Sequence, residues 1–477
     1  MINRPKTKNS LRWLYPGMKV KRWLLLAILG VVLISLGMSL TISVPYFRSI
    51  YLLWNRFAYG LFDHYWATVL LGIIGIAAGA ALIMFGLQKM NRSIISAIHP
   101  PGPDEVATTI FKKRPLERGP HIVAVGGGHG LHTLLHGLKN YTSNVTAIVT
   151  VFDDGGSSGR IRKEGGGLPP GDIRNCLIAL AETEPLMRDL FQHRFENEGE
   201  LKGHNFGNLF ITALTQVTGD FQKAILESSK VLAVRGRVLP TTLQNAVLKA
   251  ECEDGTLVEG ESKIGSCGKK IKRLFLDPPQ VQTTEEVLAA IQTADLIVLG
   301  PGSLFTSVLC NLAVKEVREA IIKAQAPLVF VCNITTQPGE TDRFSLAEHL
   351  QALWQFIPPE RLQYLLVNDQ KPENQVLAEL RSKGIDPITM NGIDIPPSLK
   401  VLKAPLLSLE QPTRHDPRRL AQAIVRILLE EKPSWGFYFT FYTDQGFKNL
   451  KIVRWMNHFR VRSLIRLGTH SGNESDR

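Results

Sequence analysis

Two long uncharged segments limit how this chain can fold, because apolar helices of their length need an apolar environment. Residues 23–44 and residues 66–87 each form a run of 22 residues without a charged side chain. About 20 apolar residues span the hydrocarbon core of a bilayer as a helix, so both segments predict transmembrane helices. A cleaved signal peptide is the alternative for the first segment, but its apolar run is too long and no small-x-small cleavage site follows.

The charges that flank these segments predict their orientation. Several basic residues precede the first segment and several follow the second, whereas the loop between them holds only Arg48 and Arg56 with Asp63. Positive charge favours the cytoplasmic side, so we expect a two-pass protein of the cytoplasmic (inner) membrane with both termini in the cytoplasm. Gly75 and Gly79 form a G-x-x-x-G pattern that can pair membrane helices.

The remaining chain divides by composition. Residues 1–90 form the predicted membrane anchor, residues 91–120 are a proline-containing linker, and residues 121–432 carry the periodic patterns of a folded domain. Five cysteines without a C-x-x-C pair argue against a disulfide framework or a zinc ribbon, and for a reducing compartment.

Residues 433–477 form an aromatic and basic tail. The formal charge of the chain is +12, and much of it lies in the first and last stretches. Aromatic residues followed by a cationic amphipathic pattern are typical of a segment that binds membrane lipid at the interface. A helix that packs on the folded domain is the alternative. Because the two apolar segments already place the tail near a bilayer, we expect no nucleic acid partner.

A strand–turn–helix–strand pattern opens the domain. The buried strand His121–Val125 runs into Gly126, Gly127, Gly128 and Gly130, and a helical pattern and the strand 145–151 follow. This is the first unit of a doubly wound sheet, in which a glycine turn at a helix N-terminus lets a phosphate approach. The turn does not match the strict G-x-G-x-x-G fingerprint of dinucleotide binding. A tight turn that binds no ligand is therefore the alternative, because such turns also contain glycines.

The loop after the second strand carries a more specific pattern. Carboxylates suit a ribose or Mg²⁺, while hydroxyls, glycine N–H groups and an arginine suit phosphate oxygens; a solvated turn is the alternative. A helix follows, with Asp172 as its expected N-cap and Asn175 in its first turn facing the same cleft. The candidate ligand-binding side chains in the loop are Asp153, Asp154, Ser157, Ser158 and Arg160, with Asp153 and Asp154 as candidate metal ligands.

Further polar loops follow along the chain. His204, Asn205 and Asn208 stand at a predicted helix start, where capping alone would need one of them. The strand 295–300 ends in a second glycine turn with Gly302 and Ser303, and a polar loop also follows the strand 327–333. Because carboxyl ends of parallel strands share one edge, all these loops are expected to meet in one cleft. Residues 236–282 predict an inserted β segment.

Histidine spacing offers a metal alternative. His132 and His136 have the i, i+4 spacing of zinc ligands on a helix, but no third ligand stands nearby in the sequence. Surface or cleft-lining histidines are therefore the default interpretation.

Five motifs occur in one order across residues 121–345: DDGGSSGR, GDIRN, HNFGN, GPGSLFTS and TTQPGET. This set resembles the bacterial gluconeogenesis factor family of the 2-phospho-L-lactate transferase superfamily. The resemblance implies a Rossmann-like α/β fold, a doubly wound and mostly parallel sheet, with a cleft for a nucleotide or nucleotide sugar. It also implies that Gly302, Ser303 and Phe305 line the cleft. The residues that it implies to bind the nucleotide are Gly126 to Gly130, Asp153, Asp154, Ser157, Ser158, Arg160, Asn205 and Asn208. Phe305 departs from the family pattern, in which the regulatory branch usually has tyrosine.

The resemblance implies two functions that the sequence leaves open. One is a regulatory protein that binds a UDP-N-acetylglucosamine-type ligand, supports cell shape and carbon use, and acts on a protein partner in envelope synthesis. The other is a Mg²⁺-dependent transferase that moves a phospholactyl-type group from a guanosine diphosphate donor to a deazaflavin. For catalysis, Asp154 and His204 are the best candidates. A third function, an NAD-dependent dehydrogenase, would require the standard glycine fingerprint and a ribose-binding acid, and this sequence has neither. The sequence is compatible with a homo-oligomer.

Overall fold

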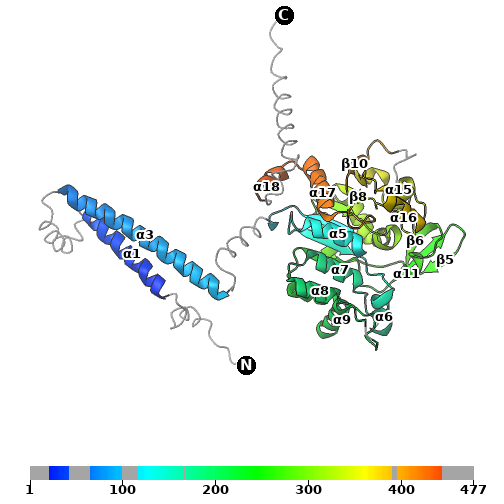
Figure 1. Cartoon of the computed structure of the whole chain (residues 1–477), viewed down its shortest axis with the longest axis horizontal. Helices are drawn as coiled ribbons and strands as arrows, with labels where there is room; N and C mark the ends of the chain where they lie inside the picture. Colours follow the sequence, from blue (N-terminus) through cyan, green and yellow to red (C-terminus); the bar gives the residue numbers. More distant parts are fainter. Residues whose placement is uncertain are drawn as a thin grey trace, which may run out of the picture. The chain divides into compact units, whose positions relative to one another are not determined.

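A computed structural model describes residues 21–41, 65–98, 116–165, 167–196, 198–388 and 395–442 (Figure 1). The chain divides into two compact units, Met1–Lys113 and Arg114–Arg477. The loop between the apolar segments and the basic part of the tail, residues 443–477, lie outside the described residues.

The N-terminal unit is a pair of apolar helices, α1 (Lys21–Thr41) and α3 (Tyr65–Ile98). Both are long and apolar enough to cross a membrane. The second helix continues beyond residue 87, the predicted end of the span, so the first part of the predicted linker is helical.

Glycines bring the two helices together. A Cβ added to Gly37 would lie 2.5 Å from the carbonyl oxygen of Gly72, and a Cβ on Gly79 would lie 2.5 Å from that of Gly30. The backbones therefore touch where these residues meet, as small residues allow in membrane helices. Gly79 of the predicted G-x-x-x-G pattern is part of this contact, whereas a Cβ on Gly75 would make only an ordinary contact, 3.6 Å from Cα of Gly37.

The second unit is built on a parallel sheet of seven strands in the order β10-β9-β8-β7-β1-β2-β3. All six neighbouring pairs are parallel, and β1 lies between β2 and β7. The strands are short and almost wholly buried near the centre, as expected for a sheet covered on both faces. Their bounds are Ile122–Gly126 (β1), Val145–Val149 (β2), Arg237–Pro240 (β3), Leu296–Leu299 (β7), Leu328–Val331 (β8), Tyr364–Asn368 (β9) and Lys400–Ala404 (β10).

Helices cover both faces of this sheet (Figure 1). The connections from β1 to β2 and from β7 to β8 run in opposite directions along the sheet, so right-handed crossovers place their helices on opposite faces. On one face α5 packs against α7 and α17, and on the other face α12 packs against α14. The predicted doubly wound α/β fold is confirmed. The helices are α5 (Gly128–Leu138), α6 (Gly156–Gly165), α7 (Gly171–Leu180), α8 (Pro185–Gln192), α9 (Phe206–Thr218), α10 (Phe221–Val231), α12 (Glu285–Gln292), the π-helix η4 (Leu304–Leu309), α13 (Cys310–Ala313), α14 (Lys315–Lys323), α15 (Leu346–Trp354), the 3₁₀ helix η5 (Pro359–Arg361), α16 (Asn374–Ser382), α17 (Pro417–Glu431) and α18 (Trp435–Tyr442).

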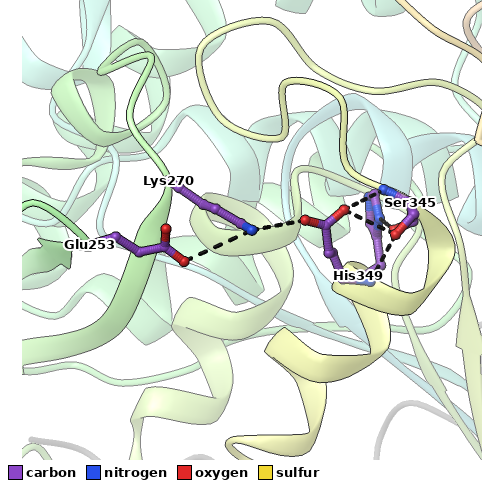
Figure 2. A network of polar contacts seen from close by, with 5 residues as sticks. Glu253, Lys270, Ser345 and His349 are labelled. Atoms are coloured by element: carbon purple, nitrogen blue, oxygen red, sulfur yellow. Dashed lines mark hydrogen bonds and ion pairs between the residues drawn. The ribbon is translucent and has the colours of Figure 1, made fainter.

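The inserted β segment is a separate antiparallel sheet. Its strands β4 (Val247–Cys252), β5 (Leu257–Glu259) and β6 (Ile271–Asp277) pair in the order β5-β4-β6, and the short helix α11 (Glu261–Ile264) lies between β5 and β6. Polar contacts join this segment to α15 (Figure 2): Lys270 Nζ lies 2.9 Å from Glu348 and 3.8 Å from Glu253. Glu348 also completes the capping box of Ser345, so the linkage acts on the start of α15.

The aromatic part of the tail belongs to the folded domain. Tyr438 and Phe439 in α18 are buried, and the Tyr438 hydroxyl donates to the backbone carbonyl of Tyr141 at 3.1 Å. The domain therefore extends about ten residues beyond its predicted end at residue 432. The rings of Tyr438 and Phe439 pack on the domain itself, as in the alternative prediction of a helix that packs on the folded domain.

Candidate functional site

A cleft of about 470 Å³ opens where the strand order reverses, at the carboxyl ends of β1 and β7. This is where doubly wound sheets bind their ligands. Loops from four strand ends contribute to it, together with α11 of the inserted segment and the turn before α17. The lining residues are Gly127, Gly128, His129, Gly130, Thr133, Asp153, Asp172, Glu261, Pro301, Gly302, Ser303, Ser307, Asn333, Ile334, Thr335, Thr336, Gln337, Pro338, Ile385, Thr413, Arg414 and His415.

The first glycine turn forms the floor of the cleft. Gly128 has φ +58°, which favours glycine, and a Cβ on Gly127 would lie 2.5 Å from the carboxylate of Asp172. A Cβ on Gly130 would collide with the carbonyl of Pro301. The turn after β1 thus packs tightly against the turn after β7. Gly126 is the last residue of β1 and does not line the cleft; its carbonyl accepts from the Thr150 backbone N–H and from the Asn311 side chain.

The two adjacent aspartates point in different directions. Asp153 lines the cleft, and its Oδ1 accepts the backbone N–H of Gly155 at 2.8 Å. The Oδ1 of Asp154 instead accepts the backbone N–H of Ser262 at 2.8 Å, at the start of α11. The structure therefore does not join the predicted metal ligands in one coordination site. Asp154 fixes the position of α11, which brings Glu261 into the cleft.

Three carboxyl groups face the same space, and the pKa of each is raised. Burial, and then the charge of Asp153, raise the pKa of Asp172 to about 7. Burial, followed by the charges of Asp153 and Asp172, raises the pKa of Glu261 to about 8. The pKa of Asp153 is raised too, mainly by burial. At neutral pH the cleft therefore holds carboxyl groups that retain a proton and can both donate and accept hydrogen bonds.

Asp172 is not the helix cap that its place in the sequence suggested. The α7 helix begins at Gly171 with Pro170 as N-cap, and Asp172 lies in its first turn. Its carboxylate accepts from the backbone N–H of Gly128, so it ties α7 to the glycine turn. Asn175 accepts from Arg174 Nη2 at 2.8 Å and does not line the cleft.

The serines of the second loop and the HNFGN residues form one buried network. Ser157 Oγ lies 3.2 Å from Nδ1 of His204 and accepts the backbone N–H of Asn205 at 3.3 Å. Asn208 donates to Ser158 Oγ at 3.4 Å, and the Asn205 side chain accepts from the Asn208 backbone N–H as the cap of α9. All five are at most 6% exposed, and none lines the cleft. Their polar atoms hold α6 against α9.

Two arginines support this network from outside. Arg160 donates to the backbone carbonyl of Lys202 at 2.8 Å, and Arg174 donates to Asn208 Oδ1 at 3.0 Å. Neither lines the cleft. The Nε of Arg174 is buried without a hydrogen-bond partner, and its charge lowers the pKa of Asp172 and Asp153.

The second glycine turn is already occupied by an acid of the chain itself. Glu340 Oε1 accepts the backbone N–H groups of Phe305 at 2.7 Å and Thr306 at 3.0 Å, at the start of η4. These two N–H groups are therefore not free to bind a phosphate. Gly302 and Ser303 do line the cleft, whereas Phe305 is buried with its ring 6.1 Å from that of Phe344.

Several lining residues were not singled out from the sequence. Thr335, Thr336 and Gln337 belong to the TTQPGET motif, and their position directly after β8 indicates that they lie at the cleft. Glu261, Arg414 and His415 carry no such signal, because they reach the cleft from an inserted segment and from a turn remote in sequence. The His415 pKa is lowered to about 4, mainly by burial, so its ring is neutral.

The structure gives no preformed metal centre within the described ranges. No three His, Cys, Asp or Glu side chains there are placed to hold an ion. His132 and His136 are stacked, with ring centroids 6.1 Å apart, and the pKa of each is lowered first by burial.

Comparisons with known proteins agree with this fold. Residues 122–407 match the family model described as 2-phospho-L-lactate transferase CofD. A putative gluconeogenesis factor from Nostoc sp. is 41% identical over 420 residues, which cover 87% of this chain and 92% of that protein. The gluconeogenesis factor of Bacillus subtilis is 45% identical over 313 residues, covering 65% of this chain and 99% of that protein. A crystal structure of a Bacillus halodurans protein matches with a TM-score of 0.62 and 45% identity, covering 64% of this chain and 99% of that one.

The fold and site define an α/β protein with a cleft at the switch point of a parallel sheet. The chain belongs to the gluconeogenesis factor family of the 2-phospho-L-lactate transferase superfamily. The match to the Nostoc protein covers more residues than the unit Arg114–Arg477 contains, so the similarity reaches into the N-terminal unit. The B. subtilis relative is shorter, and its whole length corresponds to about the size of the second unit alone.

Proposed function

We propose that the protein binds a nucleotide sugar of the UDP-N-acetylglucosamine type in this cleft and acts as a regulatory protein of envelope growth and carbon use. The observation that supports this most is the composition of the cleft walls. Glycine backbone at Gly127 and Gly128 and the guanidinium of Arg414 suit a diphosphate, while neutral and protonated oxygen groups such as Asp172 and Thr336 suit sugar hydroxyls.

Membrane attachment is part of the proposal. Helices α1 and α3 are long and apolar enough to span a bilayer, and the short connecting segment holds only Arg48 and Arg56, fewer basic residues than either flank. The soluble unit would then lie on the cytoplasmic side, where nucleotide sugars are used for envelope precursors. The basic residues after position 442 would add attraction to anionic lipid. A peptide of residues 443–470 should bind vesicles containing anionic lipid and dissociate at high salt.

A transferase is the second candidate, and the match to the transferase family model favours it. Asp153 and Asp172 would hold Mg²⁺ together with phosphate oxygens of the ligand, since Mg²⁺ is bound by one or two carboxylates plus phosphates. The ion would neutralise charge on a diphosphate leaving group. Glu261 lines the cleft and, in its ionised form, would take a proton from an acceptor hydroxyl; because its pKa is about 8, this role would favour alkaline pH. Asp154 and His204 are engaged in other contacts.

Calorimetric titration of the detergent-solubilised chain separates these functions. UDP-N-acetylglucosamine, GDP and NAD are each added with and without Mg²⁺. Binding of the UDP sugar without Mg²⁺ is expected for the regulatory protein. Preferential, Mg²⁺-dependent binding of GDP would favour the transferase instead. Binding of none of the three would contradict both proposals.

A further inference from the structure

A row of basic side chains runs along one face of α5. His129, His132, His136 and Lys139 are spaced three, four and three residues apart, which places them on one side of a helix. At about 1.5 Å per residue the row is about 15 Å long. His129 lines the cleft, so the row begins at the cleft and leads away from it.

Three arginines from other elements lie beside this row. Arg188 comes from α8, and Arg414 and Arg418 flank the start of α17. The pKa of His136 is lowered by burial and then by Lys139, Arg188 and Arg418. The pKa of His132 is lowered to about 4 by burial, by the other two histidines, and then by Lys139 and Arg414. We call these seven residues the basic row: His129, His132, His136, Lys139, Arg188, Arg414 and Arg418.

The chain's own acids do not neutralise the basic row. In the described part of the chain, no ion pair joins Arg188, Arg414 or Arg418 to a carboxylate. Glu182, which acts on Lys139, is paired with Arg235, and the Asp416 carboxylate caps α17.

One donor in the row is both buried and unused. The Nε of Arg188 has no hydrogen-bond partner in the structure. A buried donor without an acceptor is unfavourable, so an acceptor supplied from outside would stabilise it. The row therefore combines excess positive charge with an unmet hydrogen bond, and both favour an anion.

We propose that the basic row is a docking site for an acidic segment of a partner protein, an inference that rests on the proposed regulatory function. A length of about 15 Å accommodates about five residues of extended chain. Near neutral pH the positive charge of the row comes from Lys139 and the three arginines, and the carboxylates of an acidic segment complement that charge. Arg414 belongs to both the row and the cleft, so a ligand that engages it weakens docking, and docking weakens the ligand equally.

The test uses the full chain in detergent and a fluorescein-labelled peptide of eight glutamates, followed by fluorescence anisotropy. We expect binding that weakens as salt rises from 50 to 300 mM, because exposed charges are screened. The variant R188Q/R418Q should lose affinity at least five-fold. The matched control K323Q/K383Q removes two exposed lysines, on α14 and next to α16, and should change affinity less than two-fold.

Four outcomes overturn the proposal. These are no binding of the peptide, equal loss in both double variants, tighter binding of a twelve-residue oligothymidylate than of the peptide, and an affinity that does not change with pH. The last follows because an anion favours the charged forms of Lys139, whose pKa burial lowers to about 8, and of the exposed His129 and His136, so binding takes up protons and should tighten as pH falls from 7.5 to 6.0. The variant H136Q, at an exposed position, should reduce this pH dependence.

Failure of the proposed function is distinguishable. A separate titration with UDP-N-acetylglucosamine reports on the cleft alone, and peptide binding in its absence reports on the row alone. Peptide affinity that falls when the nucleotide sugar is bound would support both. Peptide binding with no nucleotide-sugar binding would overturn only the ligand assignment of the cleft.

Discussion

Two sides of the candidate site differ in how visible they are in the sequence. The loop at Asp153 to Arg160 and the HNFGN cluster are rich in unusual polar residues, yet Ser157, Ser158 and Asn208 satisfy one another in a buried network. Glu261 and Arg414 stand in unremarkable sequence, yet both line the cleft. The difference teaches that a conspicuous polar motif can build the support of a site, while less conspicuous residues supply its surface.

The largest effect that would sharpen this comparison is expected from the buried network. Asn208→Ala removes an acceptor of Arg174 and a donor to Ser158, and leaves their partners buried. We expect the free energy of unfolding to fall by about 2–3 kcal/mol. Urea unfolding of the detergent-solubilised chain measures it. Ligand affinity of the folded fraction should stay within about three-fold; a ten-fold loss at unchanged stability would place Asn208 in the ligand site instead.

Asp154 tests the link between the two sides. Asp154→Ala should weaken ligand binding ten-fold or more, about 1.4 kcal/mol, because α11 loses the acceptor that holds Ser262 and Glu261 moves. Calorimetry with the nucleotide sugar measures this. Asp154→Asn retains an acceptor oxygen and should keep most of the affinity. If the folded alanine variant binds normally, Asp154 has no part in the site.

Glu261 gives a pH-dependent test of the inconspicuous side. Its pKa is raised from 4.5 to about 8, chiefly by burial, so the folded state keeps a proton that the unfolded state releases. Stability due to this group is full below pH 4.5 and is lost as pH rises toward 8. Glu261→Gln should therefore be more stable than the parent at pH 8, by on the order of 1 kcal/mol, and nearly equal at pH 5. Unfolding curves at both values test this, and parallel pH profiles would refute it.

Phe305 is expected to show the smallest effect. Tyrosine at this position would keep or tighten binding if the ring lay beside the ligand, but the ring is 3% exposed and packs on Phe344. Phe305→Tyr should therefore lower the free energy of unfolding by about 1 kcal/mol, because a hydroxyl enters an apolar site. Affinity should be unchanged. Tighter nucleotide-sugar binding without a loss of stability would instead show that the ring of Phe305 lies beside the ligand.

Local patterns were enough to predict much of the architecture. The buried strands and the glycine turns depend on near neighbours in the chain, and the structure has them where the sequence predicted them. The inserted β segment and the two apolar helices were found for the same reason. Hydrophobic period and capping chemistry act over a few residues, so one sequence contains them.

Side-chain direction and long-range contact were decided only by the tertiary structure. Asp153 and Asp154 are adjacent in sequence, but one faces the cleft and the other caps a turn 108 residues away. Glu340 accepts the first backbone N–H groups of η4, although it lies 34 or 35 residues further along the chain. No local sequence pattern predicts this contact. The position of α18 is likewise set by a distant contact, the hydrogen bond from the Tyr438 hydroxyl to the backbone carbonyl of Tyr141. The sequence determines the type of each residue. Which polar groups form hydrogen bonds with each other depends on which distant segments the fold brings together.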